Sequence, residues 1–322
     1  MILRTLFSKL SPSGDRARLS ILIFHRVLPE PDPLFPGEIS AQKFDQICNW
    51  LSAWFTVLPL DEAVTRLKKN DLPQRALAIT FDDGYADNHE VALPILKRHG
   101  LKATFYVATG FLDGGRMWND SVIESFRTST LPFVELAGTV AAALGEIKLG
   151  DISMRRSAIN AAISAIKYLD PNERLDWVNA ISDRAGVMLP NDLMMSSAQV
   201  CGLRNAGMQI GAHTVSHPIL AKLTRNAAQR EIADSKHSLE ALLGQPVTLF
   251  AYPNGKRGED YSPESVQLVR ELGFSSAVST TWGAARSSSD LFQLPRFTPW
   301  DRNYLRFGIR LASNLMDSRR IA

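Results

Sequence analysis

Two adjacent aspartates and two histidines four residues apart have the clearest chemical potential in this sequence. Asp82 and Asp83 follow the apolar run AITF, and His213 and His217 lie in GAHTVSHPIL. Two ionised carboxylates side by side repel each other, most strongly where water is scarce. A bound cation offsets this repulsion, because one carboxylate can bind it while its neighbour remains a base. Two imidazoles and one carboxylate suit Zn²⁺ or a similar divalent ion, with positions left for water and substrate.

Each motif could also occur without any functional role, and its position relative to the predicted strands helps to distinguish a functional site from a chance occurrence. Asp-Asp-Gly is common in surface turns, and surface histidines reach the His-x-x-x-His spacing by chance. However, Asp82 follows the predicted strand 76–81, His213 follows the strand GMQIGA, and Tyr252-Pro253-Asn254 follows the run LFA. In parallel α/β proteins the loops after the strands converge at one edge and form the site. We therefore expect these three polar clusters to meet.

Strand and helix patterns alternate along most of the chain, which predicts an α/β fold with a parallel sheet, either open or closed into a barrel. Asp87 is expected to cap the helix that ends at Gly100. The predicted strands are 19–24, 55–60, 76–81, 102–108, 207–212, 247–252 and 274–280.

The alternation stops between about Met117 and Ser196, where three helical patterns follow one another. These patterns cover residues 134–146, 155–169 and 170–186. No Gly/Ser linker separates this region from the rest. The sequence therefore predicts an N-terminal amphipathic segment, 1–19, and a single catalytic domain, 20–322, with a helical insertion at about 117–196.

Composition excludes several classes of protein. The 322 residues are 45% hydrophobic and 21% charged, as in an ordinary globular protein with a sizeable core. A formal charge of +3 is too small to favour nucleic acid as a partner. The two cysteines, Cys48 and Cys201, are expected to be buried thiols. The run Ile21–Phe24 is too short for a signal-peptide core, and no stretch approaches the ~20 apolar residues of a membrane span. A cytoplasmic location is expected.

The N-terminal segment has an apolar helical face, with Arg4 and Lys9 available on its polar side. A helix packed on the protein has such a face, and so does a helix lying on a membrane surface. Both interpretations stay open, and the second predicts peripheral membrane contact. The face consists of Ile2, Leu3, Leu6, Phe7 and Leu10.

The motifs TFDDGY, HTVSHP and FAYPNG, in this order, resemble those of the polysaccharide deacetylases of carbohydrate esterase family four. The resemblance covers about 20–115 and 197–299, and implies a distorted (β/α) barrel that removes N- or O-acyl groups from sugars. By this resemblance, Asp82 matches the general base, and the metal ligands are Asp83, His213 and His217. The implied reaction is attack of metal-bound water, with zinc expected, on an acetamido carbonyl. The metal and the backbone N–H of Asn254 would stabilise the oxyanion.

Two departures from the family pattern concern the groups around the base and the acid. The third motif usually reads Arg-Pro-Pro-Tyr-Gly, whereas 251–255 lack the arginine that tethers the base. Arg296 could replace that arginine, or be an ordinary surface residue. The usual late Leu-x-His, whose histidine is the general acid, is also absent. A branch resembling the biofilm poly-N-acetylglucosamine deacetylases carries this histidine on an N-terminal strand, and His25 ends such a strand. We predict His25 as the acid; the alternative is a structural histidine.

Other functions fit part of the pattern. Removal of a formyl or acetyl group from a lipid-linked sugar would use the same fold and residues. A carbohydrate-binding pseudoenzyme would explain the two departures but not the complete ligand set. A non-haem Fe(II) oxygenase also uses two histidines and one carboxylate, but leaves Asp82 without a role. The leading prediction is a metal-dependent deacetylase acting on a polysaccharide or glycoconjugate.

Overall fold

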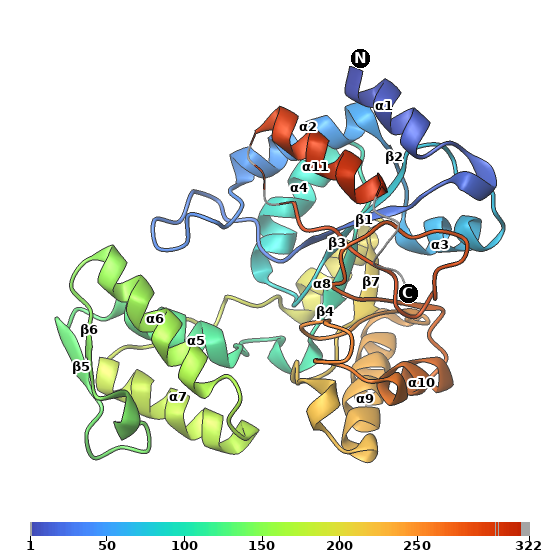
Figure 1. The fold of residues 1–322 in the computed structure, drawn as a ribbon. Helices are drawn as coiled ribbons and strands as arrows, with labels where there is room; N and C mark the ends of the chain where they lie inside the picture. The colour runs from blue at the N-terminus through green and yellow to red at the C-terminus, as the bar shows by residue number, and fades with distance from the viewer. Residues whose placement is uncertain (1, 300, 302, 317–322) are drawn as a thin grey trace. The chain divides into compact units, whose positions relative to one another are not determined.

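The computed structural model describes residues 2–299, 301 and 303–316, and the chain divides into two compact units (Figure 1). Each unit has its own hydrophobic core. All the residues predicted to form the site belong to unit 1. Unit 1 comprises Met1–Glu30, Ile39–Leu112 and Met195–Ala322, and unit 2 comprises Pro31–Glu38 and Asp113–Met194.

Unit 1 is built on a seven-stranded sheet in which all strand pairs are parallel. Its hydrogen-bonded path runs β1-β3-β4-β7-β8-β9, and β2 pairs separately with β3. The polar motifs follow β3, β7 and β8, of which β7 and β8 are neighbours and β4 separates β3 from β7. The strands are β1 (Ser20–Phe24), β2 (Thr56–Val57), β3 (Ala76–Phe81), β4 (Thr104–Val107), β7 (Gln209–Ala212), β8 (Leu249–Ala251) and β9 (Ser276–Val278).

The segment 294–297 joins the two ends of this path. Leu294 N donates to Ala277 O of β9 at 2.9 Å, and Phe297 N donates to Ile21 O of β1 at 2.7 Å. Parallel bridges link Leu294 to β9 and Phe297 to β1. The sheet therefore curls into a distorted (β/α) barrel, and the predicted fold class is confirmed.

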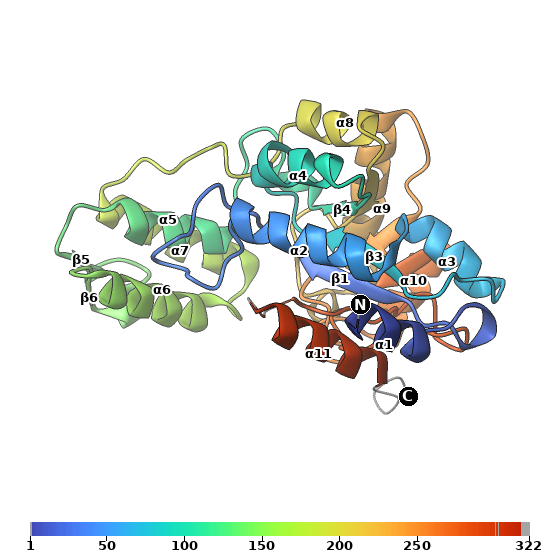
Figure 2. The ribbon, with the colours of Figure 1, turned by 90° about the horizontal axis from the view of Figure 1, so that it is seen from above.

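Helices of unit 1 pack around this sheet (Figures 1 and 2). Four helices begin at a residue whose hydroxyl accepts a backbone N–H, at Ser40, Ser196, Thr224 and Ser262. The α-helices are α1 (Ile2–Leu10), α2 (Ala41–Trp54), α3 (Leu60–Lys68), α4 (Leu93–Arg98), α8 (Ser197–Asn205), α9 (Arg225–Leu243), α10 (Pro263–Glu271) and α11 (Tyr304–Met316). Short helical turns are η1 (Gly14–Arg16), η2 (Asn88–Ala92), η3 (Thr109–Phe111) and η5 (Leu220–Lys222), of which η2 is a π-helix.

The two cysteines, both in unit 1, were expected to be buried thiols. Both cysteines are free thiols; Cys48 is buried and Cys201 is partly buried. None of the described helices is both long and apolar enough to cross a bilayer.

Unit 2 contains three helices and a hairpin, α5 (Trp118–Thr128), β5 (Phe133–Glu135), β6 (Glu146–Lys148), α6 (Ile152–Ile166) and α7 (Pro171–Ala185), with the 3₁₀ turn η4 (Ala142–Leu144). The predicted helices 155–169 and 170–186 correspond to α6 and α7. The predicted helix 134–146 is wrong, because this stretch contributes to the antiparallel strands β5 and β6. Gly138 and Gly145 adopt positive φ angles of 74° and 63°, which interrupt a helix.

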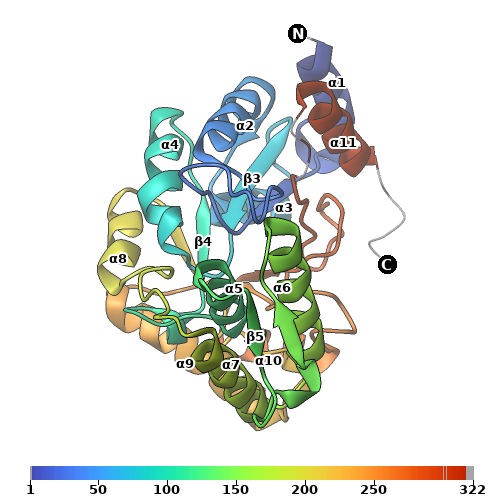
Figure 3. The ribbon, with the colours of Figure 1, turned by 90° about the vertical axis from the view of Figure 1, so that its left-hand side faces the viewer.

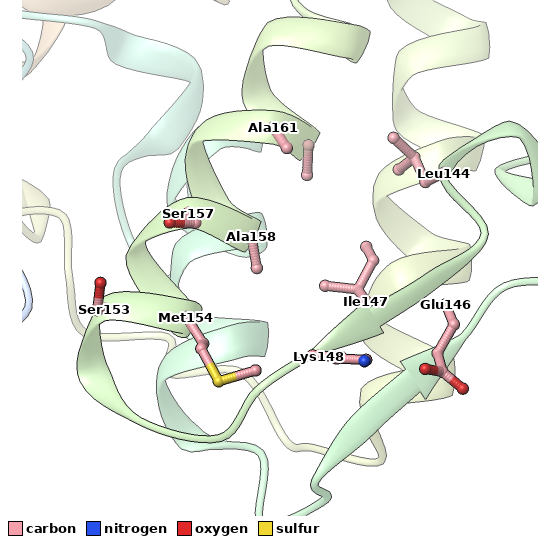
Figure 4. A pocket seen from close by; sticks show the side chains of 10 residues that line it. Leu144, Glu146, Ile147, Lys148, Ser153, Met154, Ser157, Ala158 and Ala161 are labelled. Atoms are coloured by element: carbon pink, nitrogen blue, oxygen red, sulfur yellow. The ribbon is translucent and has the colours of Figure 1, made fainter.

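A cavity of about 380 Å³ lies within unit 2. Figure 4 shows Met154, Ala158 and Ala161 of α6 on one side of it and Ile147 of β6 on the other. None of the residues that line it is a predicted site residue. The cavity is therefore separate from the chemistry predicted from the sequence.

Candidate active site

Asp83, His213 and His217 come together in the loops that follow β3 and β7. Asp83 Oδ1 lies 3.4 Å from His213 Nε2 and 3.4 Å from His217 Nε2. One potential ligand atom from each residue lies within 4.8 Å of the other two. Asp83 and His213 are buried, and His217 is partly buried. The three residues thus form a compact group at the carboxyl edge of the sheet.

The chemistry of this group fits a divalent metal. His213 Nδ1 lies 2.8 Å from Ala251 O, and because a carbonyl only accepts, Nδ1 carries the hydrogen and Nε2 faces the cluster. Asp83 Oδ1 is buried and has no hydrogen-bond donor. A buried carboxylate oxygen without a partner is costly unless a cation lies beside it. Two imidazole nitrogens and a carboxylate are a donor set typical of catalytic zinc.

The surroundings of the group shift the pKa of each of its three side chains. Burial alone would raise the pKa of Asp83, but the neighbouring histidines hold it well below its usual range. Burial alone would lower the pKa of His213, but Asp83 and Asp82 raise it above its ordinary value. Burial lowers the pKa of His217 to about 4. An ionised Asp83 and a neutral His217 are the protonation states in which these side chains bind a metal.

Asp82 has a different partner from its neighbour. Arg296 Nη1 and Nη2 donate to Asp82 Oδ1 and Oδ2, both at 2.7 Å, and both residues are buried. Arg296 Nε donates to Ser279 O at 2.8 Å, and Nη1 approaches Thr80 Oγ1 at 3.2 Å. Burial alone would raise the pKa of Asp82, but Arg296 lowers it. Asp82 is thus an oriented, ionised carboxylate, and Arg296 is 1% exposed rather than a surface residue.

The barrel closure explains how Arg296 reaches Asp82. Along a strand, alternate side chains share a face. Leu294 packs in the same cluster as alternate residues of β3, Ala76 and Ala78, whereas Phe297 packs in the cluster on the other side. Two residues after Leu294, Arg296 therefore points to the face of Thr80 and Asp82. This placement agrees with the contacts of its guanidinium with Thr80 Oγ1 and with both carboxylate oxygens of Asp82.

His25 directly follows β1 and lies level with Asp82, because β1 and β3 pair with Phe24 opposite Phe81. The Asp82 N–H donates to Phe24 O at 2.9 Å. The His25 side chain is exposed to solvent. It nevertheless lies close enough to contribute to the lowered pKa of both Asp82 and Asp83. The structure thus brings His25 to the same edge of the sheet as Asp83, His213 and His217, the candidate metal-ligand group.

Asp87 and Asn88 hold the segment that carries His25, which the sequence did not indicate. Asp87 accepts hydrogen bonds from Val27 N at 3.0 Å and Arg26 Nε at 2.8 Å. Asn88 Nδ2 donates to His25 O at 2.8 Å. Asp87 stands at the N-cap position of the helical segment that begins at Asn88, as predicted, but its carboxylate makes no cap hydrogen bond there. The sequence shows only that an Asp-Asn pair follows soon after Asp82-Asp83; the burial of this pair is seen in the structure.

Strained backbone is concentrated in these loops. A positive φ in a residue other than glycine costs roughly 1–3 kcal/mol and persists only where the surroundings enforce it. Four described residues of the three motif loops have this conformation: Asp83 (79°), Thr214 (65°), His217 (54°) and Asn254 (56°). Such strain is typical of functional loops.

Glu231 of α9 holds the conformation of the loop 213–217, which carries both histidines. Glu231 Oε2 accepts from Val215 N and Ser216 N, both at 2.9 Å, and Oε1 accepts from the Ser216 hydroxyl at 2.7 Å. These bonds fix the residues between the two histidines. The sequence gave no reason to select Glu231, since a glutamate within a helix is ordinarily solvated.

Asn254 lies three residues beyond Ala251, whose carbonyl contacts His213. The Thr280 hydroxyl donates to Asn254 O at 2.8 Å and holds the turn. Asn254 is exposed, and within the described part of the chain its backbone N–H donates to no protein acceptor. This N–H is therefore available to a ligand.

Comparison with known proteins supports this assignment. Residues 69–127 and 182–277 match the family model described as polysaccharide deacetylase. The matched segments include Asp82, the three ligand residues and Asn254, but not His25 or Arg296.

One relative, the poly-β-1,6-N-acetyl-D-glucosamine N-deacetylase of Staphylococcus aureus, is 26% identical over 180 residues, which cover 54% of this chain and 60% of the relative. Another, YxkH of Bacillus subtilis, is assigned as a polysaccharide deacetylase and is 21% identical over 87% of this chain and 71% of its own. The structure of the Streptococcus pyogenes deacetylase PplD superimposes with a TM-score of 0.62 at 20% identity, over 94% of this chain and 99% of that chain. The last comparison shows a shared fold. Because the family match and the fold agree, the chain belongs to the polysaccharide deacetylase family and is a hydrolase of the carbohydrate deacetylase class.

Proposed function

We propose that this protein is a metal-dependent hydrolase that removes an N-acetyl or other acyl group from an amino sugar in a polysaccharide or glycoconjugate. The observation that carries the proposal is the unequal environment of two adjacent carboxylates. Asp83 faces two histidines, and Asp82 faces an arginine. Neighbouring carboxylates with different partners take different roles in hydrolysis.

Asp83, His213 and His217 would hold the metal, and we propose zinc. When bound, zinc would supply Lewis-acid activation of water and of the acyl oxygen. The bond from His213 Nδ1 to Ala251 O orients one ligand ring. The bonds from Val215 and Ser216 to Glu231 hold the loop that carries both histidines.

Asp82 is the proposed base, which accepts a proton from the attacking water. Its two bonds to Arg296 fix its orientation and keep it ionised before the reaction. A carboxylate has about four lone-pair sites, so the bidentate contact leaves capacity for a proton. Arg296 is thus a positioning residue in this proposal.

Asn254 and His25 complete the proposed machinery. The backbone N–H of Asn254 would donate to the oxyanion that develops on the acyl oxygen. An amine leaves poorly unless it is protonated, and His25 is the proposed acid that gives it a proton. Its exposed side chain, beside the two aspartates, suits a group that meets substrate.

Deacylation of a lipid-linked sugar would use these same residues, so the acceptor remains a matter for experiment. The pseudoenzyme alternative is less well supported, because Asp82 is paired with Arg296 and the three proposed ligand residues lie together. An Fe(II) oxygenase would leave the Asp82–Arg296 pair without a role.

The experiment is acetate release by zinc-loaded protein from N-acetylated chitooligosaccharides and from poly-β-1,6-N-acetylglucosamine, with metal content measured in parallel. His213→Ala should lose both zinc and acetate release. His237→Ala is the matched control, since His237 is exposed on α9. Zinc bound by His213→Ala at wild-type stoichiometry would contradict the metal assignment. Wild-type protein that binds zinc but releases no acyl group from amino sugars, including lipid-linked ones, would overturn the proposed activity.

A further inference from the structure

The helices α1 and α11 lie side by side on unit 1 and carry apolar side chains on two faces. Figures 2 and 3 show this pairing of the first and last described helices. A Cβ atom at Gly308 would lie 2.6 Å from Leu3 Cδ1, so the two helices touch at this point. Phe7 is buried against Phe55 and Trp54, with ring centroids 4.5 and 5.7 Å apart. This inner face explains part of the apolar pattern of each helix.

The outer face remains exposed. On α11, Leu305, Ile309 and Met316 are 60%, 64% and 56% exposed, and on α1, Ile2 and Leu6 are 85% and 38% exposed. At about 100° per residue, the three α11 side chains fall within a stripe about 40° wide. Single exposed apolar residues are ordinary, but a stripe continued on an adjacent helix marks an interaction site.

The charges of this surface have one sign. Within the described α1 and α11, the charged side chains are Arg4, Lys9, Arg306 and Arg310, and none is acidic. Arg310 pairs with Asp301. No ion pair of Arg4, Lys9 or Arg306 occurs among the described residues. The exposed apolar stripe is thus accompanied by basic side chains.

We propose that this α1–α11 surface, with Ile2, Leu6, Leu305 and Ile309 at its centre, docks the protein on an anionic lipid bilayer. Apolar side chains of interfacial helices enter the boundary between headgroups and acyl chains, while basic side chains remain near the phosphates. Anionic lipid matches the uniform positive charge. A second copy docked through this same face would bring like charges together. The proposal does not depend on the proposed deacetylase function.

The test is flotation of the full chain with vesicles of phosphatidylcholine alone or mixed with phosphatidylglycerol. Wild-type protein should float with the mixed vesicles and less with the neutral ones, and added salt should weaken the binding. Arg306→Gln should weaken it about fivefold, the effect of one basic residue near an anionic surface. The double substitution Leu305→Ser and Ile309→Ser should weaken it by more than about tenfold.

Leu175→Ser in unit 2 is the matched control, because Leu175 is an exposed helical leucine of similar exposure. It should float as wild type does. Point substitutions are preferable to deletion of α1, which would also remove Phe7 from the core. Circular dichroism and thermal melting check that the variants are folded.

Equal flotation of wild type and the double variant, or no flotation of wild type, would overturn the proposal. So would a wild-type dimer that the double variant converts to a monomer while neither binds vesicles. In that case the surface joins two copies of the chain.

Discussion

Arg296 donates two hydrogen bonds to Asp82, one to each carboxylate oxygen at 2.7 Å, across 214 residues of sequence. The pair is buried, and Arg296 is also anchored to Ser279 O. A bidentate arginine fixes both the charge and the plane of a carboxylate. Arg296 therefore provides the orienting guanidinium that the third sequence motif, 251–255, lacks.

Replacing Arg296 with Lys should lower kcat and move the acidic limb of the kcat/KM profile to higher pH. Arg296 lowers the pKa of Asp82, so weakening this contact raises the pKa and the base becomes protonated at a higher pH. Zinc binding should be unchanged. A pH–rate profile that coincides with wild type would contradict the positioning role.

Replacing Arg296 with Ala should also reduce stability. Removing one partner of a buried ion pair typically costs about 3–5 kcal/mol, because the other charge is left uncompensated. Urea unfolding near neutral pH measures this loss. When Arg296→Ala is introduced into the Asp82→Asn variant, it should lower the free energy of unfolding by less, since no buried charge is left uncompensated. An equal loss from Arg296→Ala in the wild-type protein and in the Asp82→Asn variant would contradict the explanation.

Asp82→Asn should retain zinc but lower kcat by roughly 10²–10⁴-fold, the usual contribution of general acid–base catalysis. The amide keeps the size of the side chain and cannot accept the proton as a carboxylate does. Acetate release and zinc content, measured on the same preparation, check this. Turnover close to wild type would place the base elsewhere.

His25→Ala should lower turnover of an acetamido sugar more than turnover of 4-nitrophenyl acetate. A nitrophenolate leaves without protonation, whereas an amine does not, so only the first substrate needs the acid. His237→Ala again serves as the control. Equal losses on both substrates would indicate that His25 acts otherwise than as a proton donor.

Asn88→Ala should lower kcat because Asn88 Nδ2 holds the carbonyl of His25. The decisive measurement is a double-mutant cycle on acetate release. If Asn88 acts by positioning His25, its substitution should have little further effect on kcat once His25 is Ala. Additive effects would show that Asn88 serves the loop in general and not His25.

The residues of the metal-ligand group could be found from the sequence because their signals are local. Asp83 lies two residues beyond the end of a buried strand, and the spacing of His213 and His217 is fixed within one loop. Parallel strands bring their carboxyl ends to one edge, so the convergence of these loops could be expected from the order of strands and helices alone. The alternation of strand and helix patterns likewise predicted the parallel sheet, and the resemblance to the deacetylase family implied its closure into a barrel. In unit 2, by contrast, alanines compatible with a helix concealed the hairpin of β5 and β6.

The contacts around Asp82 and His25 were decided only by the tertiary structure. Arg296 reaches Asp82 because the segment 294–297 pairs with both β9 and β1, and this register brings its side chain to the face of Ala76 and Ala78. The bond of Asn88 to His25 O likewise joins residues 63 positions apart. Local spacing specifies which side chains share a strand or loop. Contacts between distant segments depend instead on register and on the space left inside the barrel, and these exist only once the sheet has closed.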